Sequence, residues 1–128
     1  MTTATDSQTT AELVRGYYAS WDTGIAAFDE ARLRQILAPD LLFEGPIAGS
    51  RRGVEGFLKG LADFVRATRA MHVIQRLHAG ADAATLYDCE LGETRGTLRF
   101  AEFFQVANGR IQAIRLVYDP AEFRRLTA

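Results

Sequence analysis

The sequence is poor in the residues that metal sites, disulfides and nucleotide cofactors require. It contains one cysteine and two histidines in 128 residues. Cys89 has no partner for an intrachain disulfide, and no HxH, HExxH or CxxC spacing occurs, so no metal site is predicted. The chain also lacks a GxSxG motif, a P-loop and a dinucleotide fingerprint, and we therefore expect no cofactor.

An excess of charge and a long apolar run are also missing. The formal net charge is −1, so the basic surface that nucleic-acid binding needs is not expected. No apolar run approaches the roughly 18–20 residues of a membrane span. The N-terminal residues are polar and rich in threonine, unlike a secretory signal. We expect a cytoplasmic protein without nucleic-acid or membrane partners.

The chain does have an ordinary globular composition. Hydrophobic residues make up 48% and charged residues 24%, and a chain of this length usually forms one domain. We expect residues 1–8 to be a flexible tail and residues 9–128 to form the domain.

The first half of the chain has helical periodicity. Thr9 and Glu12 form a capping box that predicts a helix to about Asp22. A second helix is predicted from about Phe28 to Leu37, ended by Pro39. The clearest amphipathic pattern predicts a third helix over Val54–Arg66, whose ordinary role would be to face the core.

The second half has the two-residue period of strands. Four strands are predicted, joined by turns at 80–82, 92–94 and 108–109. They are Met71–His78, Ala83–Leu91, Leu98–Val106 and Arg110–Tyr118. A short strand, Leu41–Glu44, precedes them. The Asn108-Gly109 pair is a strong signal for a type I′ hairpin turn. Short turns make the strands antiparallel, so the order of elements predicts an α+β fold with helices packed on one face of a curved sheet.

Glu102 is the most unusual residue in this pattern. It shares one strand face with four apolar residues, Leu98, Phe100, Phe104 and Val106. If that face is buried, desolvation would raise the pKa of the carboxyl group and would allow it to donate a hydrogen bond or carry a proton. The alternative is that Glu102 pairs with an arginine such as Arg115 on the neighbouring strand.

Two aromatic residues and the histidines are further candidates. Tyr17 and Trp21 are four residues apart on one helix face, where they either fill the core or meet a ligand. A buried tyrosine hydroxyl needs a partner, and Glu102 is a candidate. His72 would face inward if Met71 and Val73 face outward, but a lone histidine in a strand is more often structural than catalytic.

The sequence does not decide which face of the predicted strand Ala83–Leu91 points toward the core. Asp88 and Glu90 share one face, and Tyr87 and Cys89 share the other. If the acidic face is concave, Asp88 joins Glu102 in a pocket; if it is convex, both acids are solvated. The pair Arg51-Arg52 is expected to lie at the solvated surface.

Several segments together resemble a known superfamily. The segments are YYASWDTG, LAPDLLFEGP, GVEGFLKGL and AEFFQVANGRIQAIRLVYDP, spread from about Leu13 to Phe123. They are similar to the SnoaL-like branch of the nuclear transport factor two-like superfamily. This resemblance implies a cone-shaped, strongly curved antiparallel sheet wrapped on three N-terminal helices, with a deep apolar cavity. It also implies a homodimer formed through the outer face of the sheet.

The resemblance can be carried over only residue by residue. Tyr17 and Glu102 match the hydrogen-bonding pair of steroid isomerases in this superfamily, but the position of their base is Gly45, so His72 or Asp88 would have to replace it. The second aspartate of limonene-type epoxide hydrolases has no counterpart in the last strand. Polyketide cyclases use a single pocket acid, a requirement that Glu102 alone could meet.

We therefore expect a cavity that binds a small, largely apolar molecule. Its predicted walls are Tyr17, Trp21, Phe43, Phe57, Phe104, Leu116 and Tyr118. Cofactor-independent acid/base chemistry on a carbonyl compound is the expected activity, with Glu102, Tyr17, His72 and Asp88 as candidate catalytic residues. The alternative is a non-catalytic ligand-binding or dimerisation module, because this fold hosts both kinds of protein.

Overall fold

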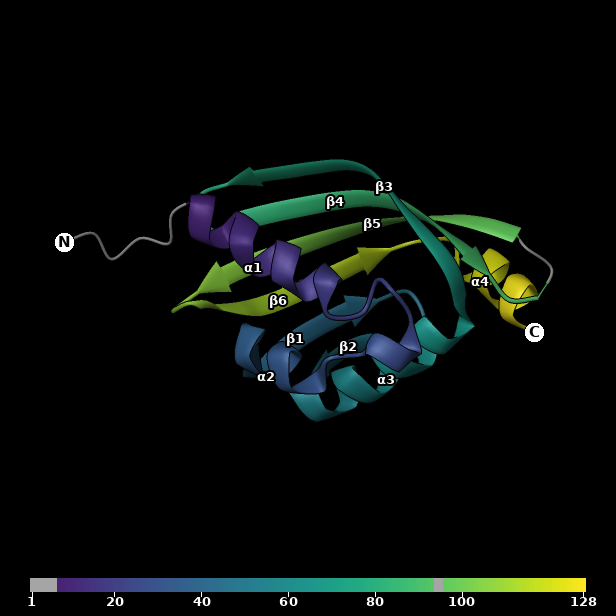
Figure 1. The fold of residues 1–128 in the computed structure, drawn as a ribbon, viewed down its shortest axis with the longest axis horizontal. Helices are drawn as coiled ribbons and strands as arrows, with labels where there is room; N and C mark the ends of the chain where they lie inside the picture. Colours follow the sequence, from purple (N-terminus) through teal and green to yellow (C-terminus); the bar gives the residue numbers. More distant parts are fainter. Residues whose placement is uncertain (1–6, 94–95) are drawn as a thin grey trace.

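A curved sheet of six strands wraps over the N-terminal helices (Figure 1). The structure is a computed structural model and describes residues 7–93 and 96–128. The sheet order is β2-β1-β6-β5-β4-β3, and only the β1–β6 pair is parallel. The α+β fold with a curved, unclosed sheet and a single domain agrees with the prediction from sequence.

Four α-helices and a short 3₁₀ helix accompany this sheet in the described ranges. They are α1 (Ser7–Ala19), η1 (Ile25–Ala27), α2 (Glu30–Ile36), α3 (Val54–Ala67) and α4 (Pro120–Thr127). α1 begins two residues before the predicted cap, Thr9, so Ser7 and Gln8 are helical; residues 1–6 of the expected tail lie outside the described residues. α2 begins at its N-cap Asp29, whose side chain accepts a hydrogen bond from the amide of Arg32 at 3.0 Å.

The predicted strands are found, and all but the last are longer than the sequence pattern predicted; the last, β6, ends one residue earlier, at Val117. The strands of the sheet are β1 (Leu37–Gly45), β2 (Gly49–Arg52), β3 (Thr68–Ala79), β4 (Asp82–Leu91), β5 (Gly96–Ala107) and β6 (Arg110–Val117). Pro39 does not end α2, because the helix already ends at Ile36 and β1 continues through the proline. β2 was not among the predicted strands; pairing with β1 makes this segment a strand. The predicted turn at 92–94 lies partly outside the described residues.

The hairpin between β5 and β6 confirms the turn signal. Asn108 and Gly109 both have positive φ, 54° and 73°, as a type I′ turn requires. The turn fixes the register of the two strands, in which Glu102 lies opposite Leu116, and β4 places Thr85 on the other side of Glu102. The β5 residues Leu98, Phe100, Glu102, Phe104 and Val106 are all buried, so their common face is the inner face of the sheet.

The C-terminal helix α4 is held against the turn after β4 by a close approach to Gly92. A Cβ atom at Gly92 would lie 2.0 Å from the carbonyl oxygen of Leu126, and Gly92 has a φ of +64°. Leu126 is itself buried. Figure 1 shows α4 beside this end of the sheet, near the C-terminus.

We expect Gly92→Ala to destabilise the protein and to loosen α4. The positive φ costs about 1 kcal/mol for alanine, and displacing the Leu126 backbone adds about 1–3 kcal/mol. Gly109→Ala is the matched control, because Gly109 has a similar φ of +73° and open space around its Cβ position. Urea denaturation checks this expectation. Equal losses in the two variants would show that the contact with Leu126 contributes nothing.

Candidate functional site

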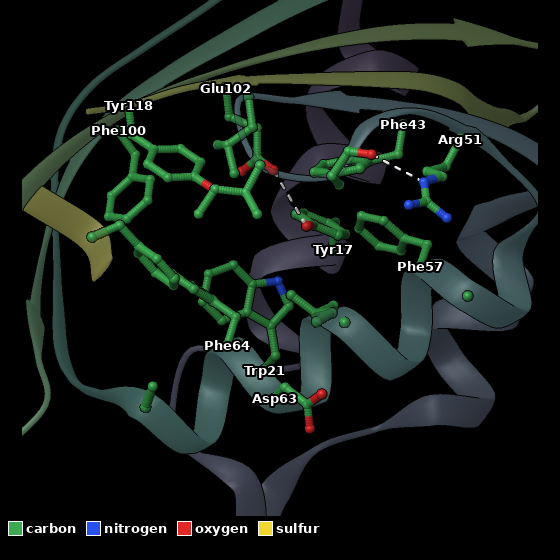
Figure 2. A pocket seen from close by; sticks show the side chains of 18 of the residues that line it. Tyr17, Trp21, Phe43, Arg51, Phe57, Asp63, Phe64, Phe100, Glu102 and Tyr118 are labelled. Carbon is green, nitrogen blue, oxygen red and sulfur yellow. Dashed lines mark hydrogen bonds between the residues drawn. The ribbon is translucent and has the colours of Figure 1, made fainter. Parts of the chain in front are cut away.

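A large pocket lies between the inner face of the sheet and the helices. Its volume is about 630 Å³, within the range of small-molecule sites. The lining residues come from α1, β1, β2, α3, β4, β5, β6 and α4 and are mostly apolar or aromatic. Figure 2 shows Phe43, Phe57, Phe64 and Phe100 around the space, with Glu102 on the sheet side.

Glu102 lies in this pocket and is hydrogen-bonded to three tyrosines. Its Oε1 accepts from Tyr18 at 2.6 Å and from Tyr87 at 3.3 Å, and its Oε2 accepts from Tyr17 at 3.4 Å. The residue is only 2% exposed. The alternative pairing with Arg115 is wrong, because Arg115 donates to Glu44 at 2.7 Å instead.

Burial controls the ionisation of Glu102. Desolvation raises the pKa of its carboxyl group from 4.5 to about 7, although the hydrogen bonds from Tyr18, Tyr87 and Tyr17 oppose this rise. Removing a charge from water is costly, whereas donors to a carboxylate stabilise it. Both protonation states are therefore populated near neutral pH, which suits a group that takes and returns protons.

The three tyrosines play different parts in this arrangement. Tyr18 makes the shortest bond but does not line the pocket, so it holds Glu102 from behind. Tyr17 lines the pocket, and its bond to Oε2 is long (Figure 2). A ligand acceptor can therefore compete for the Tyr17 hydroxyl, and a ligand donor can reach Oε2. Burial raises the pKa of all three tyrosines well above 10, so they act as neutral donors.

Trp21 supplies another donor in the pocket wall. Its indole Nε1 is buried and has no hydrogen-bond partner within the described part of the chain. The indole N–H is near enough to Tyr17 to oppose the rise in the pKa of that tyrosine, but it does not meet the hydroxyl with hydrogen-bond geometry. An unsatisfied buried donor is costly. An acceptor on a bound ligand would remove that cost.

Most of the predicted pocket walls are found in the pocket, with one exception. Tyr17, Trp21, Phe43, Phe57, Leu116 and Tyr118 all line it. Phe104 does not, because the α1 tyrosines lie against it, with ring centroids 5.4 Å (Tyr17) and 5.9 Å (Tyr18) from its own. Phe104 is therefore a core residue that supports the pocket from behind.

Two of the predicted catalytic residues lie elsewhere. His72 is exposed on β3 and its Nε2 is 3.1 Å from Oε2 of Glu90. Asp88 accepts two hydrogen bonds from Arg99, at 2.8 and 3.0 Å. On β4 the buried residues are Ala83, Thr85, Tyr87, Cys89 and Leu91, so the acids face outward. The prediction that His72 or Asp88 joins Glu102 is wrong, because strand alternation directs both away from the pocket.

Cys89 also lies on the inner face of β4 but is no reaction centre. Its side chain is fully buried, and burial raises the pKa of its thiol to about 12. The residue therefore stays protonated and packs as a small apolar group.

Several residues of the site were missed in the sequence. Tyr18 was not considered as a site residue, and Tyr87 was noted only as lying on the face of its strand opposite to Asp88 and Glu90. Arg51 and Arg52 are exposed, as expected, and both also line the pocket. Phe64, Phe100 and Phe123 complete its far wall. Alternation along β4 was the available signal for Tyr87, since Asp88 and Glu90 favour the wet face.

Gly45, the position matched to a base by resemblance, has no side chain, and one placed there would require a small shift of the Phe43 ring. A Cβ atom at Gly45 would lie 3.1 Å from Cζ of Phe43. Glu44, the preceding residue, is engaged by Arg115. The only carboxylate that the described residues bring into the tyrosine cluster is therefore Glu102.

Two other features bear on the class of protein. Among residues 7–93 and 96–128, no three His, Cys, Asp or Glu side chains gather closely enough to hold a metal ion. No helix in the same ranges has the length and apolar character needed to cross a membrane.

Solved structures share this fold at low sequence identity. A candidate SnoaL-like polyketide cyclase from Jannaschia sp. CCS1 has a TM-score of 0.80 and 11% identity, over 98% of this chain and 96% of that one. A candidate ketosteroid isomerase from Kribbella flavida has a TM-score of 0.71 and 23% identity, over 90% and 81%. A nuclear transport factor two-like protein of unknown function from Burkholderia pseudomallei has a TM-score of 0.76 and 19% identity, over 94% and 98%.

Such identities establish the fold alone. No match was found among curated proteins. The family model of the SnoaL-like domain, however, matches residues 14–114 of the sequence. This range is most of the chain and includes Tyr17, Tyr87 and Glu102. The chain belongs to the SnoaL-like domain family.

Proposed function

We propose that the protein binds a small, mostly apolar carbonyl compound and transfers a proton next to its carbonyl group without a cofactor. The observation that carries this proposal is Glu102, buried at the inner wall of the pocket with a pKa of about 7 and three tyrosine donors. The fold family is consistent with such chemistry.

The proposed reaction uses Glu102, Tyr17 and Trp21 of the pocket lining. The Glu102 carboxylate removes a proton from the carbon next to the carbonyl group. Negative charge then develops on the carbonyl oxygen, which the neutral hydroxyl of Tyr17 and the N–H of Trp21 stabilise by hydrogen bonds. The protonated Glu102 returns the proton to the same carbon or to a neighbouring one. Tyr18 and Tyr87 keep the carboxylate in place throughout.

Tyr17→Phe is expected to weaken binding of a ketone about tenfold. Loss of one hydrogen bond to a buried carbonyl oxygen costs about 1–2 kcal/mol. The suitable probe pair is 2-tetralone and tetralin, which share a shape and differ in the carbonyl group. Their dissociation constants can be measured by calorimetric titration. Tetralin should bind both proteins equally; an equal loss for the two compounds would assign Tyr17 to packing alone.

The second candidate is a non-catalytic binding module of the same fold. Gly45 favours it, because the position matched to the base of the steroid isomerases carries no acid, and a Cβ atom there would lie 3.1 Å from the ring of Phe43. In that case the same pocket binds the carbonyl compound and releases it unchanged.

A homodimer, which the family resemblance implies, is compatible with both proposed functions and stays a prediction. The proposed interface is the outer face of the sheet, where Phe103 on β5 is 48% exposed. Ile74 and Leu77 on the edge strand β3 are also exposed large hydrophobic residues. A second copy that covered these residues would remove their apolar surface from water.

A further inference from the structure

One part of the pocket wall carries positive charge that the proposed reaction does not use. Arg51 and Arg52 of β2 both line the pocket. Arg51 lies opposite Phe43 in the β1–β2 register. Figure 2 shows the Arg51 guanidinium group beside the rings of Phe43 and Phe57, across the pocket from Trp21 and Phe64.

The Arg51 guanidinium group is held at one nitrogen and free at the other two. Its Nε donates to the carbonyl oxygen of Ala48 at 3.0 Å. Neither terminal nitrogen has a hydrogen bond or ion pair with any residue that the structure describes. Arg52 differs, because its Nη1 donates to the carbonyl oxygen of Asp40 at 3.4 Å.

The acids of β1 and of the pocket lining are already engaged by other partners. Glu44 pairs with Arg115 at 2.7 Å, and Asp63, the exposed acid of the pocket lining, pairs with Arg66 at 3.2 Å. Glu102 is surrounded by tyrosine hydroxyls rather than by cations. The pocket therefore offers a cation with which no carboxylate among residues 7–93 and 96–128 forms an ion pair.

The start of α3 leaves room beside these arginines. Gly53 and Gly56 line the pocket, and a Cβ atom at either position would meet nothing within 4 Å. Gly53 is the N-cap of α3 and provides no side-chain acceptor for the first amides of the helix. An anion placed next to Arg51 would meet this open, positively polarised space.

We infer that the natural ligand is an oxo acid whose carboxylate binds Arg51 while its carbonyl group faces Tyr17 and Glu102. The inference rests on the proposed function and names the class of its substrate. The planar fork of an arginine matches the two oxygens of a carboxylate. The aromatic walls between the two polar ends take up the apolar middle of the molecule.

The test compares acids with their neutral esters. The probes are 3-benzoylpropionate and 4-benzoylbutyrate with their methyl esters, because each carries a ketone, an aromatic ring and a carboxyl group at different spacing. The parent protein should bind the better acid about tenfold more tightly than its ester, since a charge-assisted bond is gained. Sodium chloride should reduce this preference, because the arginine is exposed and its charge is screened by salt.

Arg51→Met should bring the acid and its ester to within about twofold of each other, with the affinity for the ester unchanged. Arg99→Met is the matched control, since Arg99 pairs with Asp88 on the outer face of the sheet; it should keep the tenfold preference. Retention of the preference in Arg51→Met, or equal binding of acid and ester by the parent, would overturn the inference. Ester binding that still depends on Tyr17 would then leave the proposed function standing. No binding of either form would contradict both.

Discussion

Glu102→Gln is expected to slow the exchange of the acidic hydrogens of 2-tetralone for deuterium at least about 100-fold. A positioned general base typically contributes a factor of 10²–10⁴. Glutamine has nearly the same shape and still accepts a hydrogen bond, but it cannot take a proton. Exchange is followed by proton NMR in D₂O, and it needs no knowledge of the natural product of the reaction.

The pH dependence of this exchange provides an independent check. The carboxylate form is the base, so the rate in the parent should rise with pH and level off above about 7, the pKa of buried Glu102. Glu44→Gln removes a carboxylate that pairs with Arg115 and should leave both the rate and its profile intact. A Glu102→Gln protein that retained the parental rate would exclude Glu102 as the proton carrier and favour the non-catalytic module.

The same substitution should change the pH dependence of stability. Desolvation raises the pKa of Glu102 from 4.5 to about 7 in the folded state. Between these values the folded protein binds a proton that the unfolded chain has released, so the free energy of unfolding falls as the pH rises. The neutral carboxyl group gives its full contribution below about pH 4.5, and this contribution is lost as the pH passes through about 7. The difference corresponds to about 3 kcal/mol.

The glutamine of the Glu102→Gln variant does not titrate, so the free energy of unfolding of the variant should lack this fall with rising pH. Relative to the parent, the variant should gain about 3 kcal/mol between pH 4.5 and pH 8. Urea denaturation of both proteins at intervals of one pH unit gives this difference directly. Titrations of the other groups cancel in the comparison. Curves that run parallel from pH 4.5 to pH 8 would mean that the carboxyl group is not desolvated in the folded protein.

The elements that follow from short-range patterns were predicted well from the sequence. The hairpin at Asn108-Gly109, the helix α3 and the inward face of Glu102 all depend on local periodicity or turn chemistry. The strand β2 was not predicted, because Gly49–Arg52 has no alternating pattern and becomes a strand only by pairing with β1. Long-range pairing of this kind leaves little local trace.

The site was predicted less completely than the fold for a related reason. The pairing of Glu102 with Tyr17 followed from the expectation that a buried hydroxyl finds a partner. The roles of Tyr18 and Tyr87 depend on which face of each element is buried, and that is decided by packing between elements. The same packing places the exposed Arg51 at the pocket wall, a position that the sequence did not indicate for the Arg51-Arg52 pair.

Trp21 also makes the pocket observable by spectroscopy. It is the only tryptophan in the chain, it lies in the pocket wall, and it is 2% exposed. Its emission therefore comes from a single indole in a dry, aromatic environment. A carbonyl group that accepts the free indole N–H would lie within contact distance of the fluorophore and would quench it. Ligand entry can thus be followed in the unmodified protein, without a label and without turnover.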